Sequence, residues 1–178
     1  MQKGCIQLYY GDGKGKTTAA MGQIVRCVGH GFRVLVYQFL KEPTSGEVSV
    51  IRNLPGVEYI ENEGPIPFMF NLTPEQQEFF REKFQKKFDI VRGKFFSGEY
   101  DLVVLDEIID AYNLGTIDKE QLHEMMEKKP ENTELVITGH QYGMDMSELI
   151  KRADYVTKFV KEKHPFDLGM PCRKGIEE

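Results

Sequence analysis

The sequence predicts a three-layer α/β/α fold around a mostly parallel β-sheet. Short, β-branched apolar runs alternate with segments of helical periodicity along the chain, which is typical of parallel βαβ units. A glycine-rich turn follows the first run and leads into a helical pattern. No Pro/Ser-rich linker interrupts the 178 residues, so 1–178 are expected to form a single nucleotide-binding domain with a tail, 161–178, that lacks periodicity.

The first half of the chain is expected to contain three strands and one helix. The helix after the first strand ends near Gly29 and Gly31, and it is predicted to bury one face. The residues of that face are Met21, Ile24, Val25 and Val28. The predicted strands are 5–10, 33–39 and 57–60, and the predicted loops are 40–46 and 61–71.

The second half begins with a long helix over 73–96. Thr73 is its predicted N-cap, with Pro74 as the first helical residue and Gln76 completing a capping box. An aromatic stripe on this helix is expected to face the core, and it consists of Phe80, Phe84, Phe88, Val91 and Phe95. A buried strand at 102–105, a helix capped by Asp118 with Gln121, a strand at 134–138, a helix at 145–152 and a strand at 155–160 follow.

Charge and cysteine content exclude several classes of protein. The formal net charge of −5 argues against nucleic acid as a partner, because proteins that bind it are usually basic. The three cysteines are widely spaced, so neither a disulfide framework nor a zinc site is expected. With no signal peptide and no membrane-spanning run, the protein is expected to be soluble and cytoplasmic.

The glycine-rich turn is predicted to bind phosphate. It reads Gly11-Asp12-Gly13-Lys14-Gly15-Lys16-Thr17-Thr18. The free N–H groups of such a turn and of the helix start attract anions, to which Lys16 adds a charge and Thr17 a hydroxyl for Mg²⁺. The loop is one residue shorter than the usual pattern, because only three residues separate Gly11 from Gly15. A shorter loop is expected to hold a triphosphate differently.

Polar residues also follow the other predicted strands. Gln38 and Lys41 end the second strand, Asp106 and Glu107 end the buried strand at 102–105, and His140 follows the strand at 134–138. Ligands of parallel sheets bind at the carboxyl ends of the strands, so these residues are expected to converge on one crevice. Asp106 and Glu107, with Thr17 opposite, are the expected Mg²⁺ ligands.

An apolar cluster on the loop 61–71 needs a partner. Phe68, Met69 and Phe70 either close over the core or contact an apolar ligand. His140 has two interpretations as well, since a lone histidine after a strand is more often a surface residue than a ligand.

These motifs resemble the P-loop ATP:corrinoid adenosyltransferases, whose fold is that of the RecA-like P-loop NTPases. The matching segments are 10–20, 28–31, 38–41, 102–107, 136–139, 163–169 and 174–177. The resemblance implies transfer of the 5′-deoxyadenosyl group of ATP to a Co(I) corrinoid with release of triphosphate, on a short loop that holds ATP in a reversed sense.

The same resemblance implies roles for individual residues. Lys16, Thr17 and Glu107 would be catalytic, and residues 11–18 with Gln38 and Lys41 would bind the nucleotide. Phe68 and Phe70 stand where relatives often carry an aromatic pair that includes Trp, and His140 stands where they often carry Arg. These three residues would contact the corrinoid.

The resemblance also implies Mg²⁺, an electron donor that reduces the cobalt, and a homodimer. Two other functions stay open at this point. An ordinary P-loop kinase or NTPase would transfer a terminal phosphate, and a carrier would bind ATP or corrinoid without turnover.

Overall fold

A single parallel sheet forms the centre of the molecule in the computed structural model, which describes residues 3–42, 44–66 and 72–177. The strands lie in the order β3-β2-β4-β5-β1-β6, and each strand runs parallel to its neighbours. Their bounds are β1 Ile6–Gly11, β2 Val34–Gln38, β3 Val57–Ile60, β4 Leu102–Asp106, β5 Glu134–Gly139 and β6 Tyr155–Phe159.

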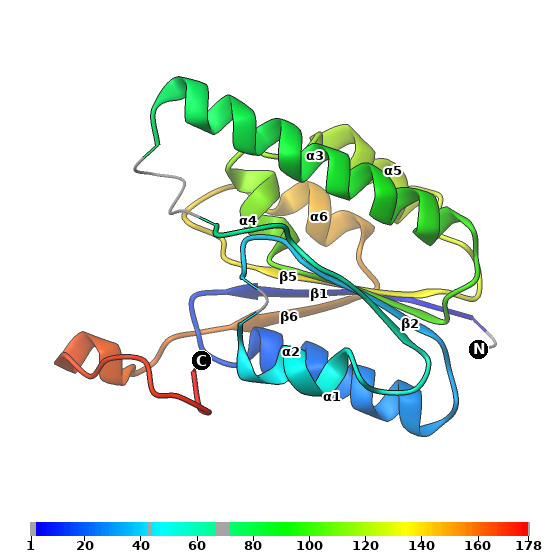
Figure 1. The fold of residues 1–178 in the computed structure, drawn as a ribbon, viewed down its shortest axis with the longest axis horizontal. Coiled ribbons are helices and arrows are strands. Elements are labelled where there is room, and N and C mark those ends of the chain that lie inside the picture. Colours follow the sequence, from blue (N-terminus) through cyan, green and yellow to red (C-terminus); the bar gives the residue numbers. More distant parts are fainter. Residues whose placement is uncertain (1–2, 43, 67–71, 178) are drawn as a thin grey trace.

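Helices cover both faces of the sheet. Their bounds are α1 Lys16–Gly29, α2 Gly46–Ile51, α3 Pro74–Phe96, α4 Ile108–Asn113, α5 Lys119–Glu127 and α6 Ser147–Arg152. Figure 1 shows α1 and α2 on one face and the other four helices on the opposite face. The predicted three-layer α/β/α fold is confirmed.

The alternation of side chains along the strands divides the core into two parts. In β2, Val34 and Val36 pack with Ile24 on the side of α1, whereas Leu35 and Tyr37 pack with Phe88 on the side of α3. The central strands are buried on both faces, as expected for parallel strands between two layers of helices. All their C-terminal ends point to one edge of the sheet.

The long helix α3 agrees closely with its prediction. Thr73 Oγ1 accepts a hydrogen bond from the Gln76 amide at 3.3 Å, and Gln76 Oε1 accepts one from the Thr73 amide at 3.0 Å, which is the predicted capping box. Four residues of the aromatic stripe are buried, and Phe80 is half-buried.

One of the two hydrogen bonds predicted for the second capping box has a different partner. Asp118 does cap α5, because its carboxylate accepts hydrogen bonds from the amides of Glu120 and Gln121. The amide of Asp118, however, donates to Gln85 of α3 at 2.8 Å, and the Gln121 side chain also bonds Gln85. A residue distant in sequence therefore replaces the local partner and joins α3 to α5.

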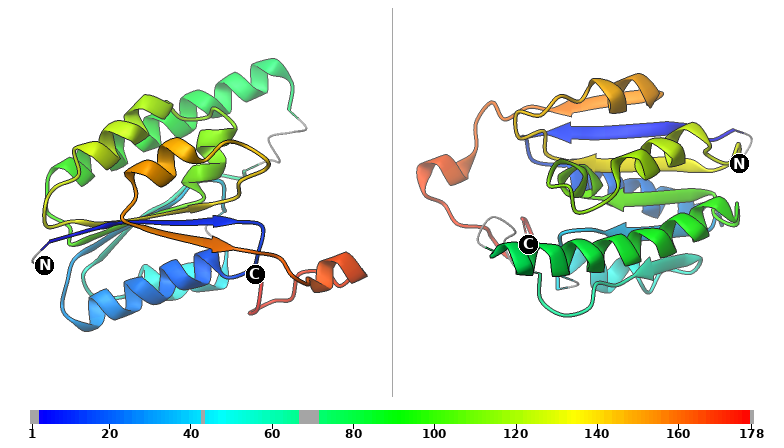
Figure 2. Two further views of the ribbon diagram at one scale, coloured as in Figure 1. Left: turned by 180° about the vertical axis from the view of Figure 1, so that it is seen from behind. Right: turned by 90° about the horizontal axis from the view of Figure 1, so that it is seen from above.

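Three further predictions need correction. Val25 is 55% exposed, and the buried face of α1 continues through Ala20 and Cys27 instead. The helices α2 and α4 were not predicted, since a six-residue helix has fewer than two turns and gives little periodicity. The tail contains a short 3-10 helix, Pro165–Leu168, which extends away from the sheet in both views of Figure 2. No helix in the described ranges is long and apolar enough to cross a membrane.

Candidate active site

The phosphate loop connects β1 to α1 and lies against the end of β6. The amide of Gly13 donates to the Phe159 carbonyl at 2.9 Å. A Cβ on Gly11 would lie 2.3 Å from that carbonyl oxygen, and one on Gly13 would lie 2.8 Å from backbone atoms of Phe159 and Val160. The two glycines therefore let two backbones touch, and this contact fixes the shape of the short loop.

Lys16 curls back over the loop. Its ammonium donates to the carbonyl of Gly13 at 3.0 Å, and the residue is 8% exposed. Burial lowers the pKa of Lys16, while Asp110, Glu107 and Asp106 oppose that effect. The loop thus carries a buried cation next to the free N–H groups of the α1 start, which is an environment that attracts phosphate.

Asp106 is the most enclosed group of the site, with no exposed surface. Its carboxylate accepts from Thr138 Oγ1 at 2.6 Å, from Gln38 Nε2 at 3.0 Å and from Thr17 Oγ1 at 3.1 Å. Burial alone would raise the pKa of Asp106, but the charge of Lys41 and the hydrogen bonds from Thr138 and Gln38 lower it below its ordinary value. The group is a fully paired carboxylate.

Glu107 begins α4 in the left-handed region, with φ of 60°. Its amide donates to Thr138 Oγ1 at 3.0 Å, so Thr138 holds both acidic residues. Burial raises the pKa of Glu107, and the nearby carboxylates of Asp106 and Asp110 raise it further, against the charge of Lys41. The unusual backbone turns this side chain toward the same space as Asp106.

Lys41 occupies the position between the predicted metal ligands. Its ammonium lies 2.9 Å from Thr17 Oγ1, 3.0 Å from Asp106 Oδ2 and 3.4 Å from Glu107 Oε1. Two carboxylates and a hydroxyl are hard oxygen ligands of the kind that Mg²⁺ prefers, and they already surround a cation here. The donor set therefore fits Mg²⁺, although no cluster of three or more His, Cys, Asp or Glu suited to a metal occurs in the described ranges.

The structure places the other predicted nucleotide residues around this centre. Gln38 lies behind Asp106, where it also accepts from the Tyr59 hydroxyl, so it supports the carboxylate from within the fold. Thr18 and Asp12 are exposed, and Asp12 accepts from the Lys161 amide. Lys14 donates to the Ile176 carbonyl at 3.0 Å, which brings the tail back to the loop.

The three predicted corrinoid contacts have different outcomes. Phe68 and Phe70 lie in 67–71, outside the described residues. His140 follows β5 and bonds Asp110 of α4. Asp110 was not expected to be a site residue, because α4 was not predicted. Tyr142, which stacks on His140, was not expected either. The one signal for Asp110 in the sequence is its own acidic side chain, three positions after Glu107.

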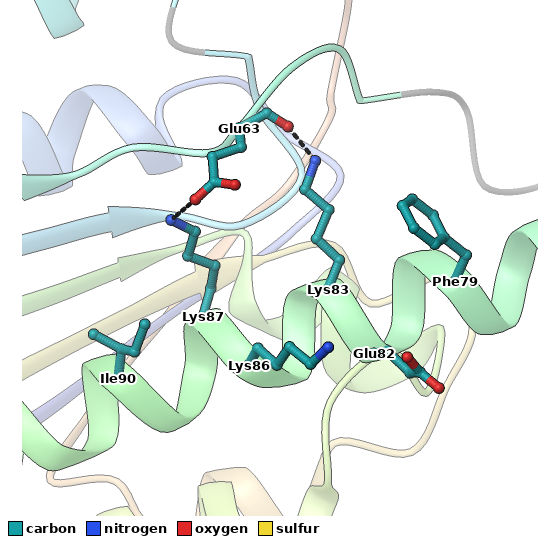
Figure 3. Close-up of a pocket in the computed structure, with 7 residues that line it drawn as sticks. All are labelled: Glu63, Phe79, Glu82, Lys83, Lys86, Lys87 and Ile90. Carbon is teal, nitrogen blue, oxygen red and sulfur yellow. Dashed lines mark hydrogen bonds and ion pairs between the residues drawn. The ribbon is translucent and has the colours of Figure 1, made fainter.

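A separate hollow of about 380 Å³ lies over α3, lined by Glu63, Phe79, Glu82, Lys83, Lys86, Lys87 and Ile90. Figure 3 shows Lys87 paired with the Glu63 carboxylate, and Lys83 bonded to the Glu63 carbonyl. These contacts anchor the segment that precedes residues 67–71 to α3. The residues that line this hollow include none of the phosphate loop, 11–18, and neither Asp106 nor Glu107.

Comparison with known proteins places the whole chain in one family. The family model described as ATP:corrinoid adenosyltransferase BtuR/CobO/CobP matches residues 2–177. A corrinoid adenosyltransferase of Pseudomonas aeruginosa is 31% identical over 99% of this chain and 84% of its own length. One from Escherichia coli K12 is 30% identical over 99% and 86%, and one from Sinorhizobium sp is 33% identical over 99% and 81%.

Among solved structures, EssC (ATPases 2 and 3) of Geobacillus thermodenitrificans superposes with a TM-score of 0.54 at 15% identity. The match covers 98% of this chain and 36% of that one. This likeness shows a shared α/β fold. By the match over nearly its entire length, the chain belongs to the ATP:corrinoid adenosyltransferase family.

Proposed function

We propose that this chain transfers the 5′-deoxyadenosyl group of ATP to the Co(I) ion of a corrinoid and releases triphosphate. The family match over residues 2–177 carries the proposal. The structure supports it, since the short loop, Lys16 and the acidic pair lie together at the C-terminal edge of the sheet. No observation favours a kinase, an NTPase or a carrier.

The reaction makes modest chemical demands on the protein. The electron pair of Co(I) attacks C5′, the Co–C bond forms, and the pair of the broken C5′–O bond leaves with the triphosphate. No general base is needed, so the protein positions the reactants and neutralises the leaving group. Lys16 and the N–H groups at the start of α1 would bind the triphosphate.

Mg²⁺ belongs to the same proposal. Thr17, Asp106 and Glu107 would hold it, because their oxygens already surround the Lys41 ammonium. When bound, the ion would supply positive charge to the triphosphate. Lys41 would then be free to contact the nucleotide.

The remaining parts of the proposal concern partners and setting. Phe68 and Phe70 would contact the corrinoid, and an external electron donor would supply Co(I). The chain would act as a homodimer, with residues 1–178 forming one domain. The free thiols of Cys5, Cys27 and Cys172 suit a reducing compartment, for which we propose the cytoplasm.

The phosphate product tests this function. Incubation with Mg-ATP and chemically reduced cobalamin should yield adenosylcobalamin and intact triphosphate in equal amounts, measured by absorbance and ion-exchange chromatography. Lys16→Ala should lose turnover, because a hydrogen bond to a charged group contributes about 1.5–3 kcal/mol. Lys151→Ala, an exposed position on α6, is the matched control. ADP with orthophosphate, in amounts matching the corrinoid consumed, would reject the proposal.

A further inference from the structure

A second polar cluster lies beside the phosphate loop, between the end of β5 and α4. Asp110 is 3% exposed, and its carboxylate accepts from the His140 amide at 2.9 Å and from His140 Nδ1 at 3.0 Å. A buried carboxylate needs such partners, because an unpaired one is costly to desolvate. Asp110 therefore fixes both the backbone and the ring of His140.

The backbone around His140 is shaped for this contact. A Cβ on Gly139 would lie 2.4 Å from Asp110 Oδ2 and 2.6 Å from Ile109 Cβ, so only glycine permits the approach. The Asn113 side chain donates to the His140 carbonyl at 2.9 Å. Tyr142, at φ of 47°, stacks its ring on the imidazole with 5.2 Å between centroids and 27° between planes. The ring is held from several sides.

These contacts leave one ring nitrogen available. An ionised carboxylate only accepts hydrogen bonds, so Nδ1 carries the proton that faces Asp110. Nε2 has no hydrogen-bond partner among the described residues, and the side chain is 37% exposed. The arrangement presents Nε2 to solvent and holds the other side of the ring against a buried carboxylate.

His140 lies at the same edge of the sheet as the phosphate loop. Gly139 pairs in register with Tyr10, one residue before the phosphate loop begins. The charge of Asp110 also raises the pKa of the Lys16 ammonium, so the cluster and the loop cation interact electrostatically. Glu107 acts on the same Lys16 ammonium, and the Tyr142 hydroxyl lies beside Asp110. An anion bound in the loop, such as an oligophosphate, is the kind of ligand that fits this position.

We propose that His140 donates a hydrogen bond from Nε2 to the triphosphate leaving group, in place of the corrinoid contact that the resemblance implies, with Asp110 as its positioning residue. The inference rests on the proposed function. As the C5′–O bond breaks, the electron pair goes to the triphosphate oxygen, and the imidazolium stabilises that charge while Co(I) supplies the pair for the new Co–C bond.

Binding of inorganic tripolyphosphate tests the contact without turnover. Calorimetry at one fixed pH is carried out in two buffers of different ionisation enthalpy, so that proton uptake is measured together with affinity. His140→Gln should lose about tenfold in affinity, and the wild-type protein should take up more protons on binding than this variant. Titrant protonation is common to all proteins and cancels in the comparison.

Three further variants complete the test. His140→Arg should bind tightly without the proton uptake, because its charge is permanent. Asp110→Asn should weaken binding and reduce the proton uptake, which a purely structural role would not do. His30→Gln, on an exposed histidine at the far end of α1, should match the wild type. Equal affinity and equal proton uptake in wild-type protein and folded His140→Gln would overturn the inference.

Adenosyl transfer separates this inference from the proposed function. A wild-type protein that transfers the adenosyl group, but binds tripolyphosphate independently of His140, contradicts only the inference. A wild-type protein that shows His140-dependent proton uptake without adenosyl transfer supports the phosphate contact and contradicts only the proposed function.

Discussion

Lys41 separates two carboxylates that would otherwise repel each other. Asp106 has no exposed surface, so burial acts to raise the pKa of its carboxyl. The ammonium of Lys41 is the largest of the effects that bring this pKa below its ordinary value. The same carboxylates raise the pKa of Lys41 in spite of its burial. The cation and the acidic residues therefore stabilise each other, and a divalent metal could replace the ammonium among the same oxygens.

Lys41→Met tests this exchange. Removing one partner of a buried ion pair costs about 3 kcal/mol, because the other charge stays buried without compensation. The variant should melt at a lower temperature than wild type in EDTA, and Mg²⁺ should raise its melting temperature more than that of the wild-type protein. Lys151→Met, on the exposed face of α6, is the control. Equal Mg²⁺ shifts in variant and wild type would show that Lys41 does not occupy a metal position.

At this scale, sequence motifs indicated which residues would gather but not how they would be paired. The glycine-lysine-threonine run and the acidic residues after an apolar strand predicted that Thr17 and Asp106 would meet, and their side chains lie 3.1 Å apart. The place of Lys41 between them depends on the path of residues after β2, which has no local signature. Asp110 is similar, because its partner His140 lies 30 positions later.

The start of α3 is held by a local capping box. Thr73→Ala should lower the free energy of unfolding by about 1 kcal/mol, because it removes the acceptor for an amide that has no helical partner. Urea denaturation measures the change, and Lys86→Ala, exposed in the middle of the same helix, serves as the control. A loss in Thr73→Ala no larger than in the control would show that the capping box contributes no stability.

The long helices and the strands were predictable, and the short helices α2 and α4 were not. The stripe from Phe80 to Phe95 spans several turns, so it fixed both the existence and the buried face of α3. The strand β3 matches its predicted bounds, 57–60. Most residues of the helix α4 are buried and apolar, so its sequence resembles a continuation of the buried strand β4. The positive φ of Glu107, which separates the strand from the helix, has no signature in the sequence. For α5, the tertiary contact of Gln85 replaced the local pattern.

The phosphate loop depends on a segment from the opposite end of the described chain. Gly13→Ala would place a methyl group 2.8 Å from backbone atoms of Phe159 and Val160, which cannot rotate away. We expect the end of β6 to separate from the loop, with loss of tripolyphosphate binding by calorimetry and a lower melting temperature. Gly22→Ala is the matched control, because nothing lies within 4 Å of its added methyl group and alanine favours the helix by up to about 1 kcal/mol. Unchanged binding in Gly13→Ala would contradict this account of the loop.

The pairing of β1 also determines when the site can form during synthesis. Ile6 pairs with Leu135 and Gln7 with Tyr155, so the ribosome makes β1 and the loop long before their neighbours in the sheet exist. Until then β1 is an unpaired apolar strand, the kind of segment that aggregates or recruits chaperones. Because such distant contacts close slowly, the nucleotide site assembles among the last features of the nascent protein. A ribosome stalled before residue 155 would therefore carry a chain that contains the entire phosphate-binding motif but lacks the end of β6 against which the loop packs.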